Sequence, residues 1–101
     1  MGERLQLQQL LEEALGSPNV YFQPPANIEM AYPAIVYHRD QARTSFAGNS
    51  PYRYTQRYQV TVIDRDPDNE VIKKIAALPM STFNRFFTAE NLNHDVFNLY
   101  F

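Results

Sequence analysis

Two short clusters in this sequence carry side chains of the kinds that most often do chemistry in proteins. His38 and Asp40 are two residues apart, and His94 is followed directly by Asp95. A histidine beside a carboxylate can move a proton or bind a metal ion, because imidazole titrates near neutral pH and both groups are metal ligands. Convergence of His38, Asp40 and His94 in space would give the centre of a small nuclease or toxin-like enzyme.

The spacing within each cluster argues against that chemistry. Residues two apart share one face of a strand, so His38 and Asp40 would offer two ligands, whereas metal sites usually need three or four. Adjacent strand residues point to opposite faces, so His94 and Asp95 would cooperate only in a turn, where we expect Asp95 to make an Asx-type bond to the backbone. The sequence also lacks a glycine-rich phosphate loop and a nucleophile at a known spacing from a base. We therefore predict a protein that is not an enzyme, with no catalytic residue, no metal site and no cofactor.

A third pattern interleaves basic and aromatic residues, namely Arg53, Tyr54, Arg57 and Tyr58. Such mixtures are typical of stacking platforms for single-stranded nucleic acid. Strand alternation, however, places the arginines on one face and the tyrosines on the other, whereas a platform needs both on the same exposed face. The net charge of −2 gives no basic footprint either. The pattern favours tyrosines packed on the core and arginines facing solvent or a partner, with a nucleic-acid-binding module as an alternative.

The first half of the chain predicts one helix and two strands. Apolar residues at helical spacing predict an amphipathic helix over residues 3–15, which Gly16 and Pro18 would end. A short edge strand is expected at 20–22, because the prolines that follow cannot donate to a ladder, and a clearer strand at 34–39. The polar stretch 40–51 predicts a long loop, and long loops are often functional.

The second half predicts three more strands and a helix. Residues 52–64 alternate with period two, which is typical of a half-buried antiparallel strand. Pro67 is expected at the first position of a helix that ends near Leu78. Strands are expected at 83–89 and 95–101, joined by residues 90–94. The order α-β-β-β-α-β-β predicts an α+β fold, with a single mostly antiparallel sheet and two helices packed on it.

The sequence predicts one domain, residues 1–101, because its length suits a single core. Its last residues, Leu99, Tyr100 and Phe101, are costly in water unless buried, so we expect the final strand to be tied into a sheet or a neighbouring subunit. The absence of cysteine excludes a disulfide scaffold and a thiolate metal site. No apolar run has the length of a membrane span, and the start lacks the order of a signal peptide, so we expect cytoplasmic synthesis and no membrane partner.

Four segments of the chain resemble a known family over about residues 5–101, namely 20–25, 30–37, 58–64 and 92–101. The family comprises the small tail-completion proteins of long-tailed phages and prophages, also described as tail terminators or tail-to-head joining proteins. The resemblance implies an α+β subunit that forms a ring, usually a hexamer. The ring caps the tail tube, stops polymerisation of the major tail tube protein and offers a docking face to the filled head.

The same resemblance implies three further properties. The partners would be other copies of the chain, the tail tube protein and a head-completion or neck protein, while DNA would pass through the lumen without specific binding. The protein would reside in the virion at the tail end or neck, and in the bacterial host cytoplasm during assembly. Neighbouring neck proteins are similar in size and composition, so a head-closure or other connector role is the nearest alternative.

The resemblance carries over no individual functional side chain, so the contact residues are predicted from the sequence itself. The stretch 40–51 holds one large apolar residue, Phe46, in a polar context, which suits an anchor inserted into another subunit. The next strand offers an arginine face. The predicted protein–protein interface residues are Arg43, Thr44, Phe46, Arg53 and Arg57.

Overall fold

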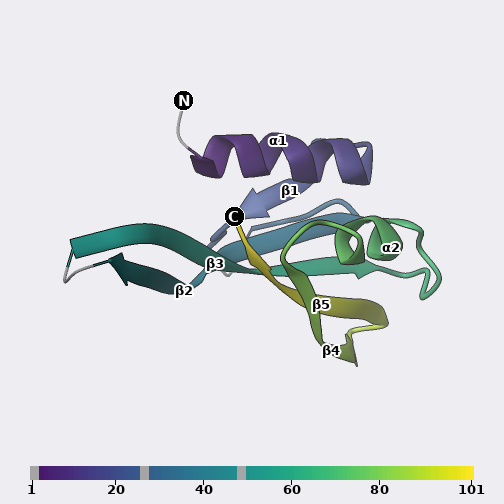
Figure 1. Ribbon diagram of the computed structural model, residues 1–101. Helices are drawn as coiled ribbons and strands as arrows, with labels where there is room; N and C mark the ends of the chain where they lie inside the picture. The colour runs from purple at the N-terminus through teal and green to yellow at the C-terminus, as the bar shows by residue number, and fades with distance from the viewer. Residues whose placement is uncertain (1–2, 26–27, 48–49) are drawn as a thin grey trace.

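The computed structural model describes the backbone of residues 3–25, 28–47 and 50–101, and the side chains of residues 4–25, 28–40 and 56–101. Five strands form one sheet in the order β1-β2-β3-β5-β4. The two helices lie on the same face of this sheet (Figure 1). The α+β class and the order of elements along the chain are therefore as predicted.

Helix α1 (Glu3–Leu15) forms where the apolar stripe predicts it. Leu7 and Leu11 are fully buried against the sheet. The helix ends at Gly16, whose φ of 74° lies in the left-handed region that glycine adopts at little cost. The backbone N–H groups of Gly16 and Ser17 both bond to the carbonyl of Glu12, which satisfies an acceptor at the helix end.

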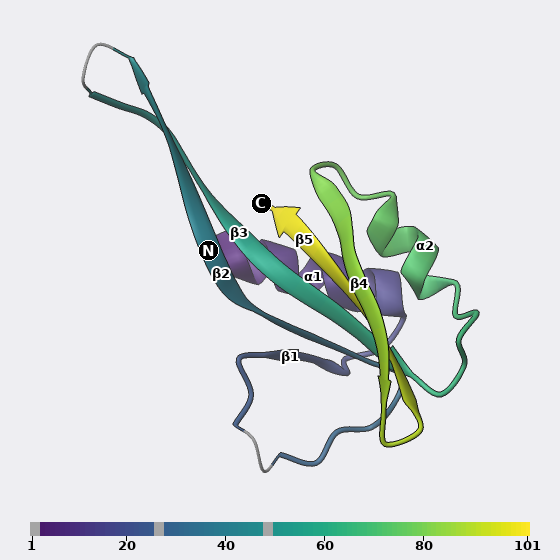
Figure 2. The same cartoon turned by 90° about the horizontal axis from the view of Figure 1, so that it is seen from below.

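The short strand β1 (Val20–Phe22) lies at one edge of the sheet, as the following prolines predict. It runs parallel to β2 (Ala34–Ala47), so the sheet is mixed, and the expectation of antiparallel pairing is wrong for this pair alone. A parallel pair needs a crossover connection rather than a tight turn. The described residues of that connection, 23–25 and 28–33, lie beside β1 (Figure 2).

The predicted long loop at 40–51 is wrong, because this stretch belongs to two paired strands. Strand β2 continues to Ala47, and β3 (Ser50–Asp64) pairs with it from the Ala47–Ser50 position onward. The residues of β3 that precede Arg57 pair with β2 alone, and from Arg57 onward β3 pairs with β5 as well. Residues 41–47 and 50–56 thus form a two-stranded ribbon, here called the arm, which projects from the body (Figure 2). The sequence of residues 40–51 is mostly polar and lacks the apolar alternation of a strand that packs on a core, which is why it predicted a loop.

Helix α2 (Val71–Ala76) is shorter than predicted and starts after Pro67. Two side chains hold the preceding residues in turns instead. The Asp66 carboxylate accepts the N–H of Asp68 at 2.9 Å, and the Asn69 side-chain oxygen accepts the N–H of Val71 at 2.8 Å. Such bonds compete with helical ones, which explains the late start.

The last two strands form a tight hairpin. Strands β4 (Ser81–Ala89) and β5 (Leu92–Tyr100) are joined by Glu90 and Asn91, whose φ values of 53° and 65° suit a two-residue hairpin turn. The predicted connection at 90–94 is therefore too long, and Asp95 lies in a strand rather than an Asx turn. Strand β5 pairs with both β3 and β4, which confirms that the end of the chain is tied into the sheet.

The core lies between the helices and the sheet. Alternation along β3 buries Tyr58, Val60 and Val62 on this face, as predicted. Tyr37 is fully buried at its centre, and its hydroxyl donates a hydrogen bond to the side-chain oxygen of Gln8 at 2.5 Å. Burial raises the pKa of the Tyr37 phenol above its ordinary value.

Candidate functional site

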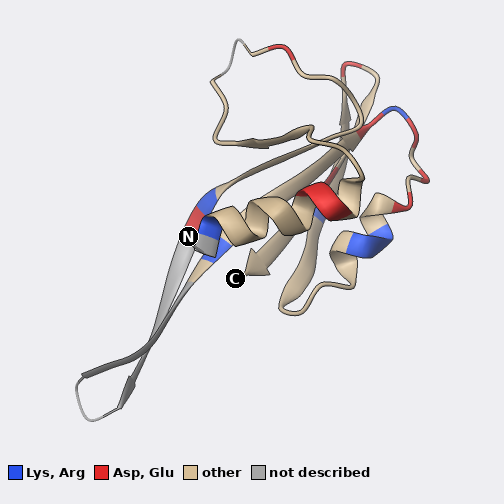
Figure 3. Ribbon diagram, turned by 90° about the horizontal axis from the view of Figure 1, so that it is seen from above, with Lys and Arg blue, Asp and Glu red and all other residues tan. Residues whose placement is uncertain are grey.

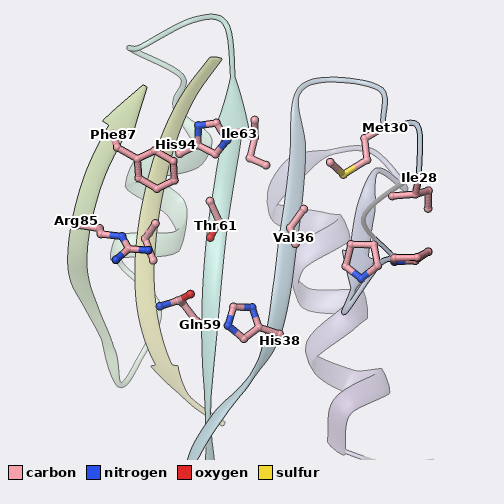
Figure 4. A pocket seen from close by; sticks show the side chains of 13 residues that line it. Ile28, Met30, Val36, His38, Gln59, Thr61, Ile63, Arg85, Phe87 and His94 are labelled. Atoms are coloured by element: carbon pink, nitrogen blue, oxygen red, sulfur yellow. The ribbon is translucent and has the colours of Figure 1, made fainter. Parts of the chain in front are cut away.

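The sheet face opposite the helices carries an open groove of about 360 Å³. Its floor is made by β2, β3 and β5, and its two walls by the β1–β2 connection and by β4 (Figure 4). Most of the lining is apolar, with polar groups interspersed. The lining residues are Pro24, Pro25, Ile28, Met30, Val36, His38, Gln59, Thr61, Ile63, Arg85, Phe87, His94 and Val96.

The two histidines lie near opposite ends of this groove (Figure 4). His38 pairs with Gln59 in the ladder, and His94 pairs with Ile63. Gln59 and Ile63 are four residues apart on β3, which corresponds to roughly 13 Å along the strand. The histidines therefore do not form one centre.

Asp40, the third member of the hypothetical enzyme centre, is bound elsewhere. It sits at a register shift between Arg39 and Gln41, and its Oδ2 accepts hydrogen bonds from Nε and Nη2 of Arg57 at 3.1 and 2.8 Å. Among the residues with described side chains, no three His, Cys, Asp or Glu groups lie close enough to hold a metal ion. The structure thus does not assemble His38, Asp40 and His94.

At one wall of the groove, two stacked rings lie beside a guanidinium group. The His94 imidazole stacks on Phe87 with 4.5 Å between ring centroids and 12° between planes. The Arg85 guanidinium carbon lies 5.5 Å from the centroid of the same Phe87 ring. The single ion pair of the described side chains joins Arg57 and Asp40, so in that part of the chain Arg85 has no carboxylate partner. None of the described residues that line the groove is acidic.

Asp95 lies on the helix-covered face and does not share this groove with His94. Its neighbours in the ladder are Val62 and Phe86, and it is only 8% exposed. Burial raises the pKa of the Asp95 carboxyl above its ordinary value, and the nearby His94 opposes this rise. His94 and Asp95 thus point to opposite faces of the sheet, as the sequence predicts for adjacent residues in a strand.

Strand β4 presents a second surface, at the other edge of the sheet from β1. It pairs with β5 alone, which leaves its second backbone edge unpaired. Phe83 and Phe86 are 58% and 51% exposed, and Met80, directly before the strand, is exposed as well. We call Met80, Phe83 and Phe86 the aromatic edge.

The aromatic edge has little of the protection that sheet edges usually carry. Its strand contains one charged residue, Arg85, and no lysine or proline. A register shift between Phe83 and Arg85 is its one irregularity. Natural edge strands are normally shielded by charges, prolines, bulges or short length, as β1 is by its three residues and the prolines after it. A nine-residue edge strand with exposed phenylalanines and so little shielding therefore favours an interaction surface.

Most of the predicted interface residues lie in the arm. The side chains of Arg43, Thr44, Phe46 and Arg53 fall outside the described residues, and their backbones belong to the paired strands. Arg57 is described at the base of the arm, half-buried and bound to Asp40. It points away from the buried Tyr58, so for this pair the structure confirms the predicted separation of arginine and tyrosine.

Sequence reasoning missed both the aromatic edge and the groove. The one available signal for the edge was three phenylalanines within residues 81–89 without a lysine or acid among them. Which strand lies at an edge depends on long-range pairing. The groove combines residues from five separate segments of the chain, so it cannot be predicted from the spacing of nearby residues.

No protein-family model matches the chain, and a comparison with curated proteins found no match. The surfaces must therefore be interpreted from their own chemistry. In the part of the chain that the structure describes, no helix is long and apolar enough to cross a membrane. Charged residues gather on the connection between β3 and α2, where Asp64, Asp66, Asp68 and Glu70 lie, rather than along the groove (Figure 3).

Proposed function

We propose that the protein is a tail terminator, a structural phage subunit that forms a ring, caps the tail tube and joins the tail to the head. The observation that supports this proposal is the aromatic edge, because an exposed apolar strand edge is a surface for assembly. The arm adds a second such element. The groove histidines, by contrast, lie too far apart to share a reaction.

The energy available at the aromatic edge is sufficient for a specific contact. A phenylalanine side chain offers about 200 Å² of surface, and half of it is exposed at Phe83 and Phe86. Burying that exposed half is worth about 2–3 kcal/mol for each ring. The unpaired backbone of β4 can add hydrogen bonds to a strand of another chain.

The arm also favours assembly. An isolated two-stranded ribbon is marginally stable in water, and this one has no further strand of its own chain beside it. A partner that covers the arm would stabilise it. Because the arm and the aromatic edge are different surfaces, contacts that use them between copies are heterologous, and heterologous contacts close into rings when the rotation permits.

The proposed mechanism is occupation of a surface. A ring of these subunits covers the end of the tail tube that the next ring of tube protein would use, so polymerisation stops. The opposite side of the ring is then free to receive the head. The acidic balance of the subunit suits a channel through which DNA passes without adhering.

Electron microscopy of tails from a phage that lacks the gene tests this function. A terminator predicts tubes much longer than those of the parent phage, and restored length when the gene is supplied in trans. Tails of parental length that lack heads would instead identify a head-closure or neck protein and overturn the proposal. A gene carrying Leu5→Ser, which alters an exposed apolar residue of α1 far from β4 along the chain, is the control and should restore the parental tail length as the wild-type gene does.

A further inference from the structure

The groove on the open sheet face is lined by residues other than those of the aromatic edge. Phe83 and Phe86 lie on the helix-covered face of the sheet, as do their ladder partners Phe97 and Asp95 on β5. Arg85 and Phe87 line the groove on the opposite face. The groove therefore remains open when the aromatic edge is occupied.

The lining defines the chemistry of an occupant. Its wall on the β1–β2 connection is apolar, and Val36, Ile63 and Val96 add apolar side chains to a floor that also holds polar ones, so apolar side chains of an occupant can fill part of the groove. Among the lining residues that the structure describes, Arg85 is the charged one, His38 and His94 can carry charge, and none has a carboxylate (Figure 4). Glu29, on the β1–β2 connection between two lining residues, is exposed and does not line the groove. An occupant with carboxylates is complementary to this surface, whereas a basic one is not.

The shape favours a segment of chain over a small molecule. Small-molecule sites bury most of their ligand, whereas this groove is open between its two walls (Figure 4). The roughly 13 Å between its histidine ends match about four residues of extended chain. Gln59, Thr61 and the two histidines are placed along that length, where they can bond to the backbone of an extended peptide.

We propose that this groove binds a short extended segment of a partner protein in which apolar residues alternate or mix with aspartate or glutamate. Apolar side chains of the segment fill the floor over Val36, Thr61 and Val96. A carboxylate of the segment pairs with Arg85, whose guanidinium is held against the Phe87 ring and is thus already oriented.

Nuclear magnetic resonance titration of the full chain, labelled with ¹⁵N, tests this site. The probes are two pools of blocked hexapeptides, one built from leucine and aspartate in all orders and the other with asparagine in place of aspartate. We expect the aspartate pool to shift the amide signals of Thr61, His94 and Val96, and to bind about tenfold more tightly than the asparagine pool. Equal binding of the two pools, or shifts confined to the aromatic edge, would overturn the proposal.

Two substitutions test whether the charge of Arg85, rather than the total charge of the protein, causes the preference for aspartate. Arg85→Gln should abolish the preference for aspartate, and because Arg85 lies on an exposed edge strand the variant should unfold at the wild-type temperature. Arg65→Gln, an exposed arginine outside the groove, is the matched control and should retain the full preference. Free phenylacetate that displaced the peptides at equal concentration would show a site for small carboxylates and would contradict a peptide occupant. These results do not depend on tail length, so the site and the proposed function can fail separately.

Discussion

Replacing both rings of the aromatic edge, Phe83→Ser with Phe86→Ser, should prevent ring formation and leave the subunit folded. The exposed fractions of 58% and 51% correspond to about 115 and 100 Å² of a side chain of roughly 200 Å². At about 25 cal/mol per Å², full burial in an interface is worth about 3 and 2.5 kcal/mol. The double variant should therefore lose up to about 5 kcal/mol per contact, or roughly a factor of 10⁴ in the association constant.

The two substitutions also remove the parts of both rings that the subunit itself buries, about 85 and 100 Å², which at the same coefficient are worth about 2 and 2.5 kcal/mol. Phe83 meets Phe97 edge-on, with 5.6 Å between their centroids, and this contact is worth about 1 kcal/mol. The free energy of unfolding, measured in urea below the concentration at which the subunit associates, should therefore fall by up to about 5 kcal/mol, which is an upper value because the unfolded chain already buries part of this area.

Light scattering over a range of protein concentrations measures the effect on assembly. Wild type and the Leu5→Ser control, which alters a residue that is 42% exposed on α1, should associate alike, whereas the double variant should remain monomeric. Association of the double variant at the wild-type concentration would refute the role assigned to the aromatic edge. Loss of association together with unfolding would refute the claim that these rings serve assembly rather than the core.

Three further substitutions test the energetics of the subunit. Burial raises the folded-state pKa of Asp95, so ionisation of its carboxyl weakens the fold as pH rises above the ordinary value of 3.8. In urea unfolding, Asp95→Asn should therefore be about 1 kcal/mol more stable than wild type at pH 7 and equally stable at low pH. A stability advantage of the variant that grew on acidification would contradict this direction of the pKa shift. Tyr37→Phe should lower the free energy of unfolding by about 1 kcal/mol, because it removes the hydroxyl bonded to Gln8. The variant should also be less sensitive to pH above 10.0, where wild type loses stability as the phenol ionises. An unchanged urea midpoint would refute the role of the buried hydrogen bond. Arg57→Gln should change the free energy of unfolding by less than about 1 kcal/mol, because its ion pair with Asp40 is partly exposed to water, and a loss above about 2 kcal/mol would show that the pair holds the base of the arm.

The elements that the sequence predicted well are those encoded by local periodicity. The stripe through Leu7 and Leu11 and the glycine after it set the limits of α1, since helix formation and termination are both local events. Alternation along β3 correctly separated the buried Tyr58, Val60 and Val62 from the opposite face.

The elements that the sequence predicted poorly depend on competition or on distant partners. Residues 40–51 are mostly polar and show no apolar alternation, so they predicted a loop, although the described backbone of this stretch is paired between β2 and β3. The acidic turn before α2 replaced helical bonds with side-chain bonds from Asp66 and Asn69, which delayed the helix. In the last hairpin, Asn91 made the turn, whereas the residues at 93–95 were held in β5 by strands on both sides.

The candidate surfaces were the least predictable features. The aromatic edge exists because β5, the last strand in sequence, is inserted between β3 and β4 and so leaves β4 outside. The groove exists because the β1–β2 connection and β4 flank the same open face. Neither arrangement follows from the spacing of nearby residues, although both follow from the topology of the sheet.

The solution mass of the protein, alone and with tail tubes added, is the most direct test of the central claim that this subunit assembles as a ring. We predict a discrete closed species, hexameric by the family resemblance, that forms with rising concentration or on the tube end and is lost in the Phe83→Ser, Phe86→Ser variant. A subunit that stays monomeric at every concentration, and that neither binds tubes nor forms rings on their ends, would show that assembly as a ring is wrong.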